Sequence, residues 1–474
     1  MGRKKRNLPL LEKVLFTDTG ESGKAVGRAG EKVVFAKGAI PGDVADVQVF
    51  RKKSSFFEGS VTQIHEYSEF RTEPFCKHFE LCGGCSWQNM QYETQANFKE
   101  KKAKDALQRL GHVEAQKWNN ILKAPAIKHH RNKLEYTFSQ SRWLTEEEIK
   151  TDLDFENRLG LGFHLPGKFD KVLHIEECHL QDLRTNDIRN FIFKKSLELE
   201  ISFFHLRNQV GVLRNLIVRN TNQDEWMLVL SITEFSEKVE NLLNQVKNEF
   251  PFITSLFYVI NTKRNDTISD LTPVLFSGKD HILEIFENPL NQKIKYRIGP
   301  KSFFQTNSNQ AQELYKLAFN LAQPKANETM YDLYTGTGSI ALFFANAVKK
   351  VVGVEYVEEA IEDAKINAQL NDIENVSFFA GDMKDIFTED FIAANGTPDL
   401  VVTDPPRAGM HADVVAQLAK LKPNRILYIS CNPATQARDL IELTPFYDVI
   451  ESQSVDMFPH TNHVENITLL HLKS

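Results

Sequence analysis

Apolar and polar positions alternate regularly from about residue 325 to the end of the chain. Short apolar runs are followed by amphipathic stretches, which is typical of a parallel sheet whose strands are connected by helices. The pattern predicts strands at about 329–334, 350–355, 376–380, 399–403 and 425–430, and helices at about 339–347, 358–370, 411–420 and 434–442. Two further strand-like runs, near 446–457 and 463–472, have no helix between them. They should close the sheet as an antiparallel hairpin, an ending that a simple dinucleotide-binding sheet lacks.

The first 65 residues show a shorter period. Alternating runs such as 32–35 and 44–49 are punctuated by glycines and by Pro41-Gly42, and this pattern predicts a small β-barrel. Residues 1–65 carry a charge of +5, whereas the rest of the chain carries −11. The difference favours a small basic module joined to a more acidic body, although a solvated charged surface explains it equally well.

Between these two regions the pattern is mixed. Residues 88–111 predict a helix, with Gly111 as its C-cap. From there to about residue 290, strand-like runs such as 210–219 and 227–232 alternate with loops. We therefore predict a barrel domain at 1–68, an α+β central domain at 69–295 and an α/β domain at 296–474.

The composition, with 42% apolar and 25% charged residues, is that of an ordinary soluble protein. The chain starts with the basic run Met1–Arg6, but no apolar stretch follows it, and no apolar run is long enough to span a membrane. We expect a cytoplasmic monomer without membrane contact. In a reducing compartment, clustered cysteines are more often metal ligands or catalysts than disulfides.

A glycine-containing segment, DLYTGTGS at 332–339, runs from the first predicted strand of the α/β domain into a helix. Its glycines allow a ligand close to the backbone, but alone the segment also fits a nicotinamide or flavin enzyme. Glu355 ends the second strand, where a carboxylate can bind ribose hydroxyls, and Asp382 follows the third, where it can bind an adenine amino group. Asp404 follows the fourth, and the two prolines after it stiffen a loop that would face a planar substrate. Each acid alone could be a solvated strand-end carboxylate, but the ordered set favours S-adenosylmethionine.

A cysteine, Cys431, follows the fifth strand close to the same crevice. Methylation of C5 of uracil requires such a group, because a thiolate must add to C6 before C5 can attack a methyl group, and a carboxylate must then remove the C5 proton. Since few ordinary thiols are ionised at neutral pH, the pocket should lower the pKa of Cys431. We predict Glu465 as the base, with His460 and His463 as weaker candidates for thiol activation or substrate contact. The alternatives are a small buried apolar residue for Cys431 and a surface glutamate for Glu465.

The other cysteines, Cys76, Cys82, Cys85 and Cys178, have the spacing of a metal or cluster site, with Gly83 and Gly84 permitting tight wrapping. Both zinc and an iron–sulfur cluster accept four thiolates. The three-plus-one spacing resembles cluster ligation more than the paired ends of a zinc ribbon. A structural or RNA-organising role is expected, and four unlinked buried thiols are the alternative.

These motifs resemble the RNA uracil-5-methyltransferase family, specifically its ribosomal branch, over nearly the whole chain. The resemblance implies a Rossmann-like class I methyltransferase domain, an N-terminal TRAM barrel of OB-like fold that binds RNA, and an α+β central domain. It places a 4Fe-4S cluster on Cys76, Cys82, Cys85 and Cys178, the nucleophile on Cys431 and the general base on Glu465. It places the S-adenosylmethionine ligands on Gln305, Tyr334, Ser339, Glu355, Asp382 and Asp404.

Two positions depart from the family pattern. Ser339 stands where some members carry Asn. Gln436 stands where Leu is usual, and we expect its polar side chain on a helix surface. The resemblance implies 23S rRNA as the substrate, because the tRNA-directed branch lacks the barrel and the cluster cysteines. The alternatives are a tRNA uridine C5-methyltransferase and an RNA-binding assembly factor with a vestigial methyltransferase fold.

RNA contacts can also be predicted outside the barrel. Basic residues on or near strand-like runs could hold phosphates, although strand arginines are usually structural; they are Arg131, Lys133, Arg214 and Arg219. The target base should be unstacked or flipped. Phe303 or Phe304 could stack on it, unless they belong to the core.

Overall fold

The structure is a computed structural model that describes residues 8–151 and 158–474. Contacts divide these residues into two compact units. Unit 1 runs up to Lys102 and also includes Phe458–His463, and unit 2 comprises Ala103–Met457 and Val464–Ser474. The basic run predicted at the start of the chain lies outside the described residues.

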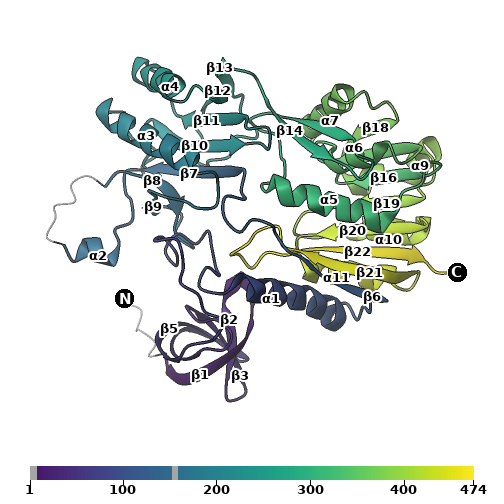
Figure 1. The fold of residues 1–474 in the computed structure, drawn as a ribbon, viewed down its shortest axis with the longest axis horizontal. Helices are drawn as coiled ribbons and strands as arrows, with labels where there is room; N and C mark the ends of the chain where they lie inside the picture. Colours follow the sequence, from purple (N-terminus) through teal and green to yellow (C-terminus); the bar gives the residue numbers. More distant parts are fainter. Residues whose placement is uncertain (1–7, 152–157) are drawn as a thin grey trace. The chain divides into compact units, whose positions relative to one another are not determined.

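Unit 1 contains a closed barrel in the strand order β1-β2-β3-β5-β4 (Figure 1). The strands are β1 (Leu10–Thr19), β2 (Ala25–Ala29), β3 (Lys32–Lys37), β4 (Val44–Lys52) and β5 (Phe56–Glu66), with a short 3₁₀ helix η1 (Glu21–Gly23) after β1. Val14, Phe16, Val34 and Val47 fill the interior, because alternate side chains of each strand point inward. The predicted barrel is therefore confirmed.

A buried carboxylate fixes the exit from the barrel. Gly42 has φ +94°, and the next residue, Asp43, is fully buried. The Asp43 carboxylate accepts hydrogen bonds from the N–H groups of Ile40 at 2.7 Å and Ser68 at 3.0 Å, and from Arg71 Nη2 at 2.7 Å. This turn thus holds the segment that follows β5.

The helix predicted at 88–111 begins four residues later, at Tyr92, and its last turn is π-helical. It consists of α1 (Tyr92–Asp105) and a π-helical turn, η2 (Ala106–Leu110). The Gly111 N–H donates to the carbonyls of Ala106 and Leu107, so Gly111 caps the helix as predicted.

The central part of unit 2 is a mixed sheet in the order β13-β12-β11-β10-β7-β8-β9. Its strands are β7 (Lys133–Ser139), β8 (Gly160–His164), β9 (Val172–His174), β10 (Leu213–Asn220), β11 (Trp226–Ile232), β12 (Ile253–Ile260) and β13 (Val274–Gly278). The helices of this part are α2 (Glu146–Ile149), α3 (Arg184–Glu198) and α4 (Glu237–Glu249). Strand β11 is buried on both faces, and α3 and α4 contribute to one apolar core with it. The predicted α+β character is confirmed.

The second sheet of unit 2 has the order β18-β17-β16-β19-β20-β22-β21-β6. Its strands are β6 (Lys117–Leu122), β16 (Thr329–Leu333), β17 (Lys350–Glu355), β18 (Val376–Ala380), β19 (Leu400–Thr403), β20 (Arg425–Ser430), β21 (Tyr447–Val455) and β22 (Glu465–Leu472). Strand β22 pairs antiparallel with both β20 and β21, so the predicted terminal hairpin is confirmed. Strand β6 comes from the range predicted for the central domain but pairs parallel with β21.

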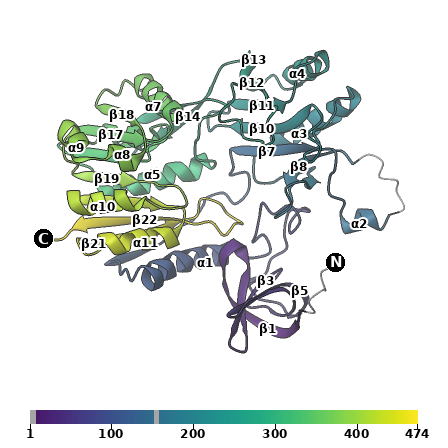
Figure 2. The same cartoon turned by 180° about the vertical axis from the view of Figure 1, so that it is seen from behind.

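Helices cover both faces of this sheet. They are α5 (Ser308–Ala322), α6 (Ser339–Ala345), α7 (Glu358–Leu370), α8 (Met383–Ile386), α9 (Glu389–Asn395), α10 (Ala412–Leu421) and α11 (Pro433–Leu443). A hairpin, β14 (Ile282–Glu287) and β15 (Lys293–Ile298), precedes them. Helix α7 packs against β17 and β18, and α11 packs against β20 and α10 (Figure 2). The strand order reverses between β16 and β19, and ligands bind at such a point in open α/β sheets.

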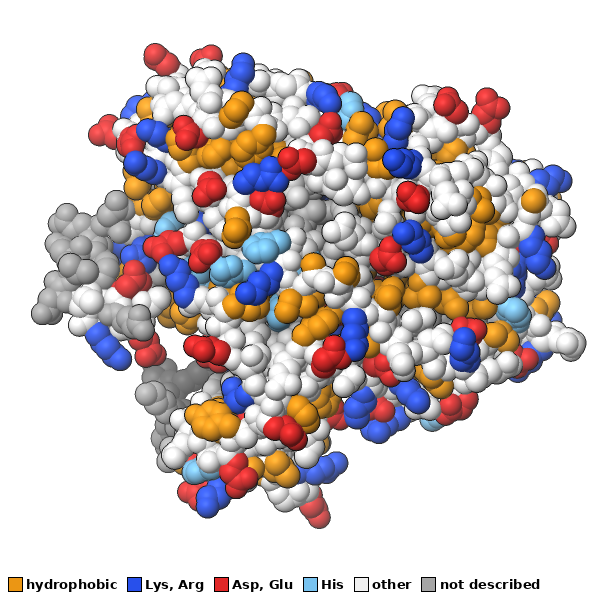
Figure 3. Space-filling view, in the orientation of Figure 1, with side chains coloured by type: hydrophobic (Ala, Val, Ile, Leu, Met, Phe, Trp, Pro, Cys, Tyr) orange, Lys and Arg blue, Asp and Glu red, His pale blue; other side chains and the backbone are white. Residues whose placement is uncertain are grey.

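No helix within residues 8–151 and 158–474 is both long and apolar enough to cross a lipid bilayer. On the face seen in Figure 3, Lys and Arg side chains are interspersed with Asp and Glu. Positive and negative side chains are therefore mixed on that face.

Candidate active site

The glycine loop after β16 rests on a buried carboxylate. Asp332 accepts hydrogen bonds from Thr335 Oγ1 at 2.6 Å and from the Ala341 N–H at 3.0 Å, with the same oxygen, Oδ2. Burial raises the pKa of Asp332 to about 7. Asp332 therefore ties both ends of the loop together, a role that its place at the end of an apolar strand did not reveal.

The loop backbone has the conformation that a ligand cradle requires. Gly336 and Gly338 have φ +55° and +77°. A Cβ on Gly336 would meet no atom within 4 Å, so this glycine borders open space. A Cβ on Gly338 would lie 3.0 Å from Ala364 Cβ, so this glycine allows α6 to pack closely on α7. Tyr334 has φ +67°, a strained value for a residue with a side chain, and packs partly buried on the sheet core.

Glu355 lies beside this loop, at the end of β17. Its Oε2 accepts from the Gly336 N–H at 3.1 Å, and its Oε1 accepts from the Val357 N–H at 3.0 Å. The carboxylate thus joins the glycine loop to the start of α7. Its side chain is half-buried at this edge of the sheet.

Asp382 caps the next helix. It accepts from the Lys384 N–H at 3.2 Å, and Lys384 Nζ lies 3.2 Å from its other oxygen. Desolvation acts to raise the pKa of Asp382, but the hydrogen bonds from Lys384 outweigh it and lower that pKa. Asp382 is therefore an ionised acceptor that already has a structural role as the N-cap of α8.

Ser339 is engaged from the side of α5. Its Oγ lies 2.9 Å from the Tyr315 hydroxyl, and its carbonyl accepts from the Tyr296 hydroxyl at 2.9 Å. The side chain of Ser339 is thus committed to the packing of α6.

The loop that carries Gln305 is held by residues of the central sheet region. Asn132 Nδ2 donates to the Gln305 carbonyl at 3.0 Å, and the Asn132 N–H donates to the Thr306 carbonyl at 2.9 Å. In this loop Phe303 is 70% exposed, whereas Phe304 is 3% exposed and packs on aromatic rings of the hairpin. Phe304 is thus a core residue, and only Phe303 is available to a base.

Two predicted phosphate-binding arginines are buried. Arg219 is 4% exposed and donates to the Ser302 carbonyl at 2.9 Å. Arg214 is 1% exposed, donates to the Asn261 carbonyl at 2.9 Å and pairs with Asp266 at 2.9 Å. The structural alternative therefore holds for both, because their guanidinium groups donate to backbone carbonyls in the interior.

Sheet register brings the predicted nucleophile and the predicted base to the same end of one strand pair. Ser430 pairs with Asn466 across antiparallel strands β20 and β22. Cys431 directly follows Ser430 and Glu465 directly precedes Asn466, and the Glu465 carboxylate is close enough to raise the pKa of Cys431. Asn432 then accepts from the Ala434 N–H at 3.2 Å and caps α11, so Cys431 lies between the end of β20 and the helix cap.

The thiol environment differs from the one predicted. Burial raises the pKa of Cys431 to about 11, and the carboxylates of Glu465 and Asp404 raise it further, whereas Arg407 lowers it. The prediction that the pocket lowers this pKa is therefore wrong. Burial also raises the pKa of Glu465 to about 8, with Asp404 acting in the same direction, and that of Asp404 to about 7.

Gln436 is fully buried rather than on a helix surface, so that prediction is also wrong. Its Oε1 accepts from Asn466 Nδ2 at 2.9 Å, and its Nε2 donates to the Tyr428 carbonyl at 3.0 Å. Asn466 further accepts from Ser454 Oγ at 3.0 Å. Gln436 therefore connects α11 to β20 and β22 directly behind Cys431 and Glu465, and helical periodicity alone could not distinguish this position from a surface one.

His460 belongs to unit 1 and is 4% exposed. Its ring makes an edge contact with Phe75, at 5.0 Å between centroids, and its Nδ1 lies 3.2 Å from Gln95 Nε2. His463 is half-buried, and its N–H donates to Thr461 Oγ1 at 3.3 Å. These contacts make His460 an anchor of its loop.

The cysteines near the N-terminus lie in a tight turn of unit 1. The Phe79 N–H donates to the Cys76 carbonyl at 3.0 Å, the Cys82 N–H donates to the His78 carbonyl at 3.0 Å, and Gly83 has φ +75°. Cys76, Cys82, Cys85 and Cys178 are all half-buried. In the part of the chain that the structure describes, no three His, Cys, Asp or Glu side chains form a metal-binding group. The iron–sulfur cluster therefore stays a prediction.

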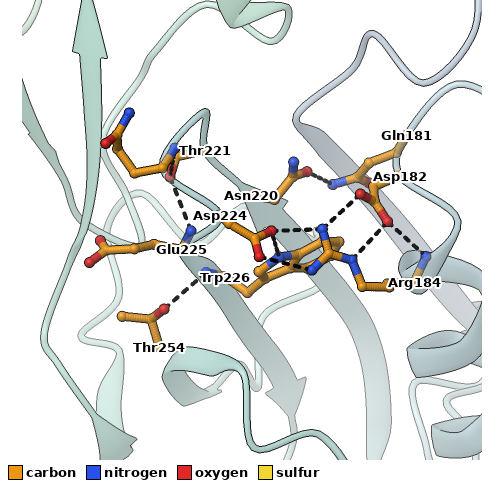
Figure 4. Close-up of polar contacts among 10 residues, drawn as sticks. Gln181, Asp182, Arg184, Asn220, Thr221, Asp224, Glu225, Trp226 and Thr254 are labelled. Carbon is orange, nitrogen blue, oxygen red and sulfur yellow. Dashed lines mark hydrogen bonds and ion pairs between the residues drawn. The ribbon is translucent and has the colours of Figure 1, made fainter.

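Cys178 lies in unit 2, just before α3. Its N–H donates to Asn186 Oδ1 at 2.8 Å. The start of α3 is fixed by Arg184, whose Nη2 lies 2.8 Å from Asp182 and 2.6 Å from Asp224 (Figure 4). The Arg184 guanidinium also stacks over Trp226, 4.7 Å from the ring centroid. This pairing orients the segment that carries Cys178.

Comparisons with known proteins identify the family of the chain. Residues 274–473 match the family model for tRNA (uracil-5-)-methyltransferases, and residues 12–62 match the TRAM domain. An uncharacterized RNA methyltransferase of Bacteroides thetaiotaomicron is 49% identical over 455 residues, which is 95% of this chain and 99% of that protein. Another from Porphyromonas gingivalis is 50% identical over 465 residues, covering 96% of this chain and 98% of its own.

A solved structure extends the likeness to the whole fold. The tRNA (uracil-54, C5)-methyltransferase of Pyrococcus abyssi, in complex with S-adenosyl-L-homocysteine, has a TM-score of 0.73 and 26% identity, and the match covers 97% of this chain and 100% of that one. Because the match includes most of the barrel, a barrel alone does not distinguish rRNA-directed from tRNA-directed enzymes. The predicted fold class is confirmed. The chain belongs to the RNA uracil-5-methyltransferase family and is an RNA methyltransferase with an N-terminal TRAM domain.

Proposed function

We propose that this enzyme transfers a methyl group from S-adenosylmethionine to C5 of a uridine in 23S rRNA through a covalent enzyme–RNA intermediate. The observation that carries the proposal is that Cys431 and Glu465 flank the Ser430–Asn466 pair of β20 and β22 and are close enough for Glu465 to raise the pKa of Cys431. Asp404 is close enough to both groups to raise their pKa values. A thiol and a carboxylate in one pocket are the two groups that this reaction requires.

The reaction begins when the Cys431 thiolate adds to C6 of the uracil. The electron pair of the C5–C6 double bond moves into the C4–C5 bond while the C4=O electron pair moves to O4, and the resulting enolate makes C5 a nucleophile. When bound, S-adenosylmethionine supplies the methyl carbon, and the electron pair of its S–CH₃ bond stays on the departing sulfur. Glu465 then takes the C5 proton, the C6–S bond breaks, and the thiolate of Cys431 is released.

The protonation states set the pH at which these residues act. With a pKa of about 8, Glu465 is mostly protonated at neutral pH and must lose its proton before it can act as a base. The Cys431 pKa of about 11 makes the thiolate a minor form, and Arg407 is the neighbouring cation that favours it. We therefore expect the reaction rate to rise as the pH rises through about 8.

The residues at the crevice fit S-adenosylmethionine. Gly336 borders open space, Glu355 lies at the ribose position of such folds, and Asp404 lies at the end of the neighbouring strand β19. These residues would hold the cofactor together with Gln305, Tyr334, Ser339 and Asp382.

The RNA would be held by more than one part of the chain. The barrel matches the TRAM domain, which we take as an RNA-binding module. On it, Arg51 lies over the ring of Phe56 and Lys52 lies over the ring of Phe57. Phe303 is exposed in the loop that carries Gln305 and would stack on the flipped base.

We further propose that Cys76, Cys82, Cys85 and Cys178 bind a 4Fe-4S cluster with a structural role. The support is chemical: three thiols lie within ten residues of one glycine-containing turn, and thiolates are the ligands of such clusters. Iron and acid-labile sulfide should be present after anaerobic purification and should fall sharply in Cys85→Ser. Protein that is folded and fully active without iron would contradict the proposal.

A second candidate substrate is tRNA, favoured by the Pyrococcus abyssi enzyme, whose name states that substrate. Methyl-labelled S-adenosylmethionine, unmodified 23S rRNA and unmodified tRNA separate the two, with nucleoside analysis of each RNA. We expect labelled 5-methyluridine in the rRNA, and label in tRNA alone would reverse the substrate assignment. Cys431→Ala should bind RNA but methylate neither; label in neither RNA with the wild-type enzyme would favour a binding factor.

A further inference from the structure

The loop Phe458–His463 connects β21 to β22 and leads into the proposed base. It belongs to the compact unit formed by the N-terminal segment rather than to the unit that contains both strands. We propose that Gln95 on α1 is a positioning residue for the reaction: it holds this loop, through His460, so that Glu465 is placed to remove the C5 proton. This inference rests on the proposed function of Cys431 and Glu465.

Gln95 is fully buried, and both ends of its amide are used. Its Oε1 accepts from the His460 N–H at 2.9 Å. Its Nε2 donates to the carbonyls of Trp87 at 2.9 Å and Met90 at 2.7 Å, and it lies 3.2 Å from His460 Nδ1. A leucine here would leave the buried His460 N–H and two carbonyls without these partners, which is costly in the interior.

Further contacts hold the same loop from the segment that carries the cysteines and from α1. The His460 carbonyl accepts from the N–H groups of Ser86 at 2.7 Å and Trp87 at 3.1 Å, directly after Cys85. Lys99 Nζ donates to the Phe458 carbonyl at 3.0 Å, and Lys102 Nζ donates to the Asn462 carbonyl at 3.1 Å.

The loop backbone needs this support. His460 has φ +64°, in the left-handed region that residues with a side chain rarely adopt. Strained conformations of this kind persist only where the surroundings hold them. Only Val464, which is 1% exposed, stands between the end of the loop and Glu465. A shift of the loop is therefore transmitted to the base over a few backbone bonds.

The nucleophile is supported in a different way. Cys431 follows β20 and is fixed by the Asn432 cap and by Gln436 behind it. A loosened loop should thus displace Glu465 while Cys431 still adds to C6 and C5 still accepts the methyl group. Since Glu465 itself raises the pKa of Cys431, its displacement does not hinder thiolate formation. The step that suffers is removal of the C5 proton, so the methylated covalent adduct should accumulate.

The test compares Gln95→Leu with Gln91→Leu in the full-length enzyme. Gln91 precedes α1 and donates to the Glu69 carbonyl at 2.8 Å in an exposed position, so its replacement is a matched control. In single-turnover reactions quenched in denaturant, the ratio of covalent adduct to released 5-methyluridine should rise about tenfold or more in Gln95→Leu and stay at the wild-type value in Gln91→Leu. The KM values for RNA and S-adenosylmethionine should change less than about twofold in both.

A merely structural role for Gln95 would lower adduct and product together and leave their ratio unchanged, which would overturn the proposal. If Gln95→Leu does not fold, Lys102→Met replaces it, because this substitution removes one hydrogen-bond donor to the loop at a half-buried position. The ratio of adduct to product should then rise as well, but less than in Gln95→Leu. Glu465→Gln separates the two levels of inference. If it accumulates no adduct, the proposed function fails; if it does and neither loop variant raises the ratio, the positioning role fails.

Discussion

At the scale of single residues, burial sets the acid–base chemistry of this site. Cys431, Glu465 and Asp404 are close enough for the carboxylates to act on the thiol, and burial disfavours the charged form of each group, so the pKa values of all three are raised. Glu465 and Asp404 also disfavour the Cys431 thiolate, while Arg407 favours it. The sequence predicted the residues but not the direction of the thiol pKa, because that direction depends on burial and on neighbours from separate strands.

Glu465→Gln should make the Cys431 thiol more acidic. The substitution removes the largest charge effect that raises the Cys431 pKa, after burial itself. The rate of Cys431 alkylation by iodoacetamide, followed on its own peptide by mass spectrometry, should reach half its maximum at a lower pH than in the wild type. Arg407→Met should shift the profile to higher pH. Profiles that coincide in all three proteins would contradict this view of the pocket.

Asp332→Asn should alter how stability depends on pH. The pKa of Asp332 is about 7 in the fold and about 4 in the unfolded chain. The unfolded chain therefore releases this proton first, and the wild type loses stability as the pH rises from about 4 to about 7. Asn has no proton to lose and keeps an oxygen for Thr335 and Ala341. From about pH 5 to about pH 8, the unfolding free energy of the variant should gain about 3 kcal/mol relative to the wild type, measured by urea unfolding. A difference that is constant with pH would contradict the assignment.

At the scale of elements, the site depends on where strands end. The glycine loop, Glu355 and Asp404 follow adjacent parallel strands, and Cys431 meets Glu465 because β22 runs antiparallel to β20. Strong strand and helix periodicity after residue 325 was enough to predict these elements. The short helices α8 and α9 were not predicted, because a helix of about one or two turns is too short to show a hydrophobic periodicity in the sequence. Strand β6 was missed because its polar residues resemble a loop, and its pairing with β21 is set by tertiary contacts.

Gln436→Leu should destabilise the junction of α11, β20 and β22. Leucine would remove the hydrogen bond that Gln436 Oε1 accepts from Asn466 and the one that Gln436 Nε2 donates to the Tyr428 carbonyl, both in the interior. We expect a loss of about 1–3 kcal/mol in unfolding free energy, measured with urea. Gln369→Leu, at an exposed position of α7, is the control and should change stability by less than about 0.5 kcal/mol. Equal effects of the two substitutions would argue against a supporting role for Gln436.

At the scale of the whole molecule, the chain combines a barrel for RNA with a catalytic sheet, and the loop before Glu465 belongs to the barrel's compact unit. Composition predicted a basic N-terminal module, and glycine and proline positions predicted the barrel. The positive-φ loop at His460 could not be predicted, because its supports come from Gln95 and Ser86, more than three hundred residues earlier in the chain.

Barrel cations should contribute to RNA affinity but not to chemistry. Replacing Arg51 and Lys52, both exposed on β4, with Gln should weaken RNA binding and reduce the slope of log Kd against log salt concentration by about 1–2. Filter binding at several salt concentrations measures this slope. Lys365→Gln on α7 is the control, and the adduct-to-product ratio should equal that of the wild type in all variants. An unchanged slope in the barrel variant would show that these cations do not contact phosphates.

The most direct test of the account is to trap the intermediate. Glu465→Gln incubated with RNA and S-adenosylmethionine should form a denaturant-resistant adduct, and peptide mapping after nuclease digestion should find a methylated uridine attached to Cys431. The Cys431→Ala, Glu465→Gln double variant should form none. Absence of the adduct in Glu465→Gln, or its persistence in the double variant, would contradict the proposed chemistry of Cys431 and Glu465.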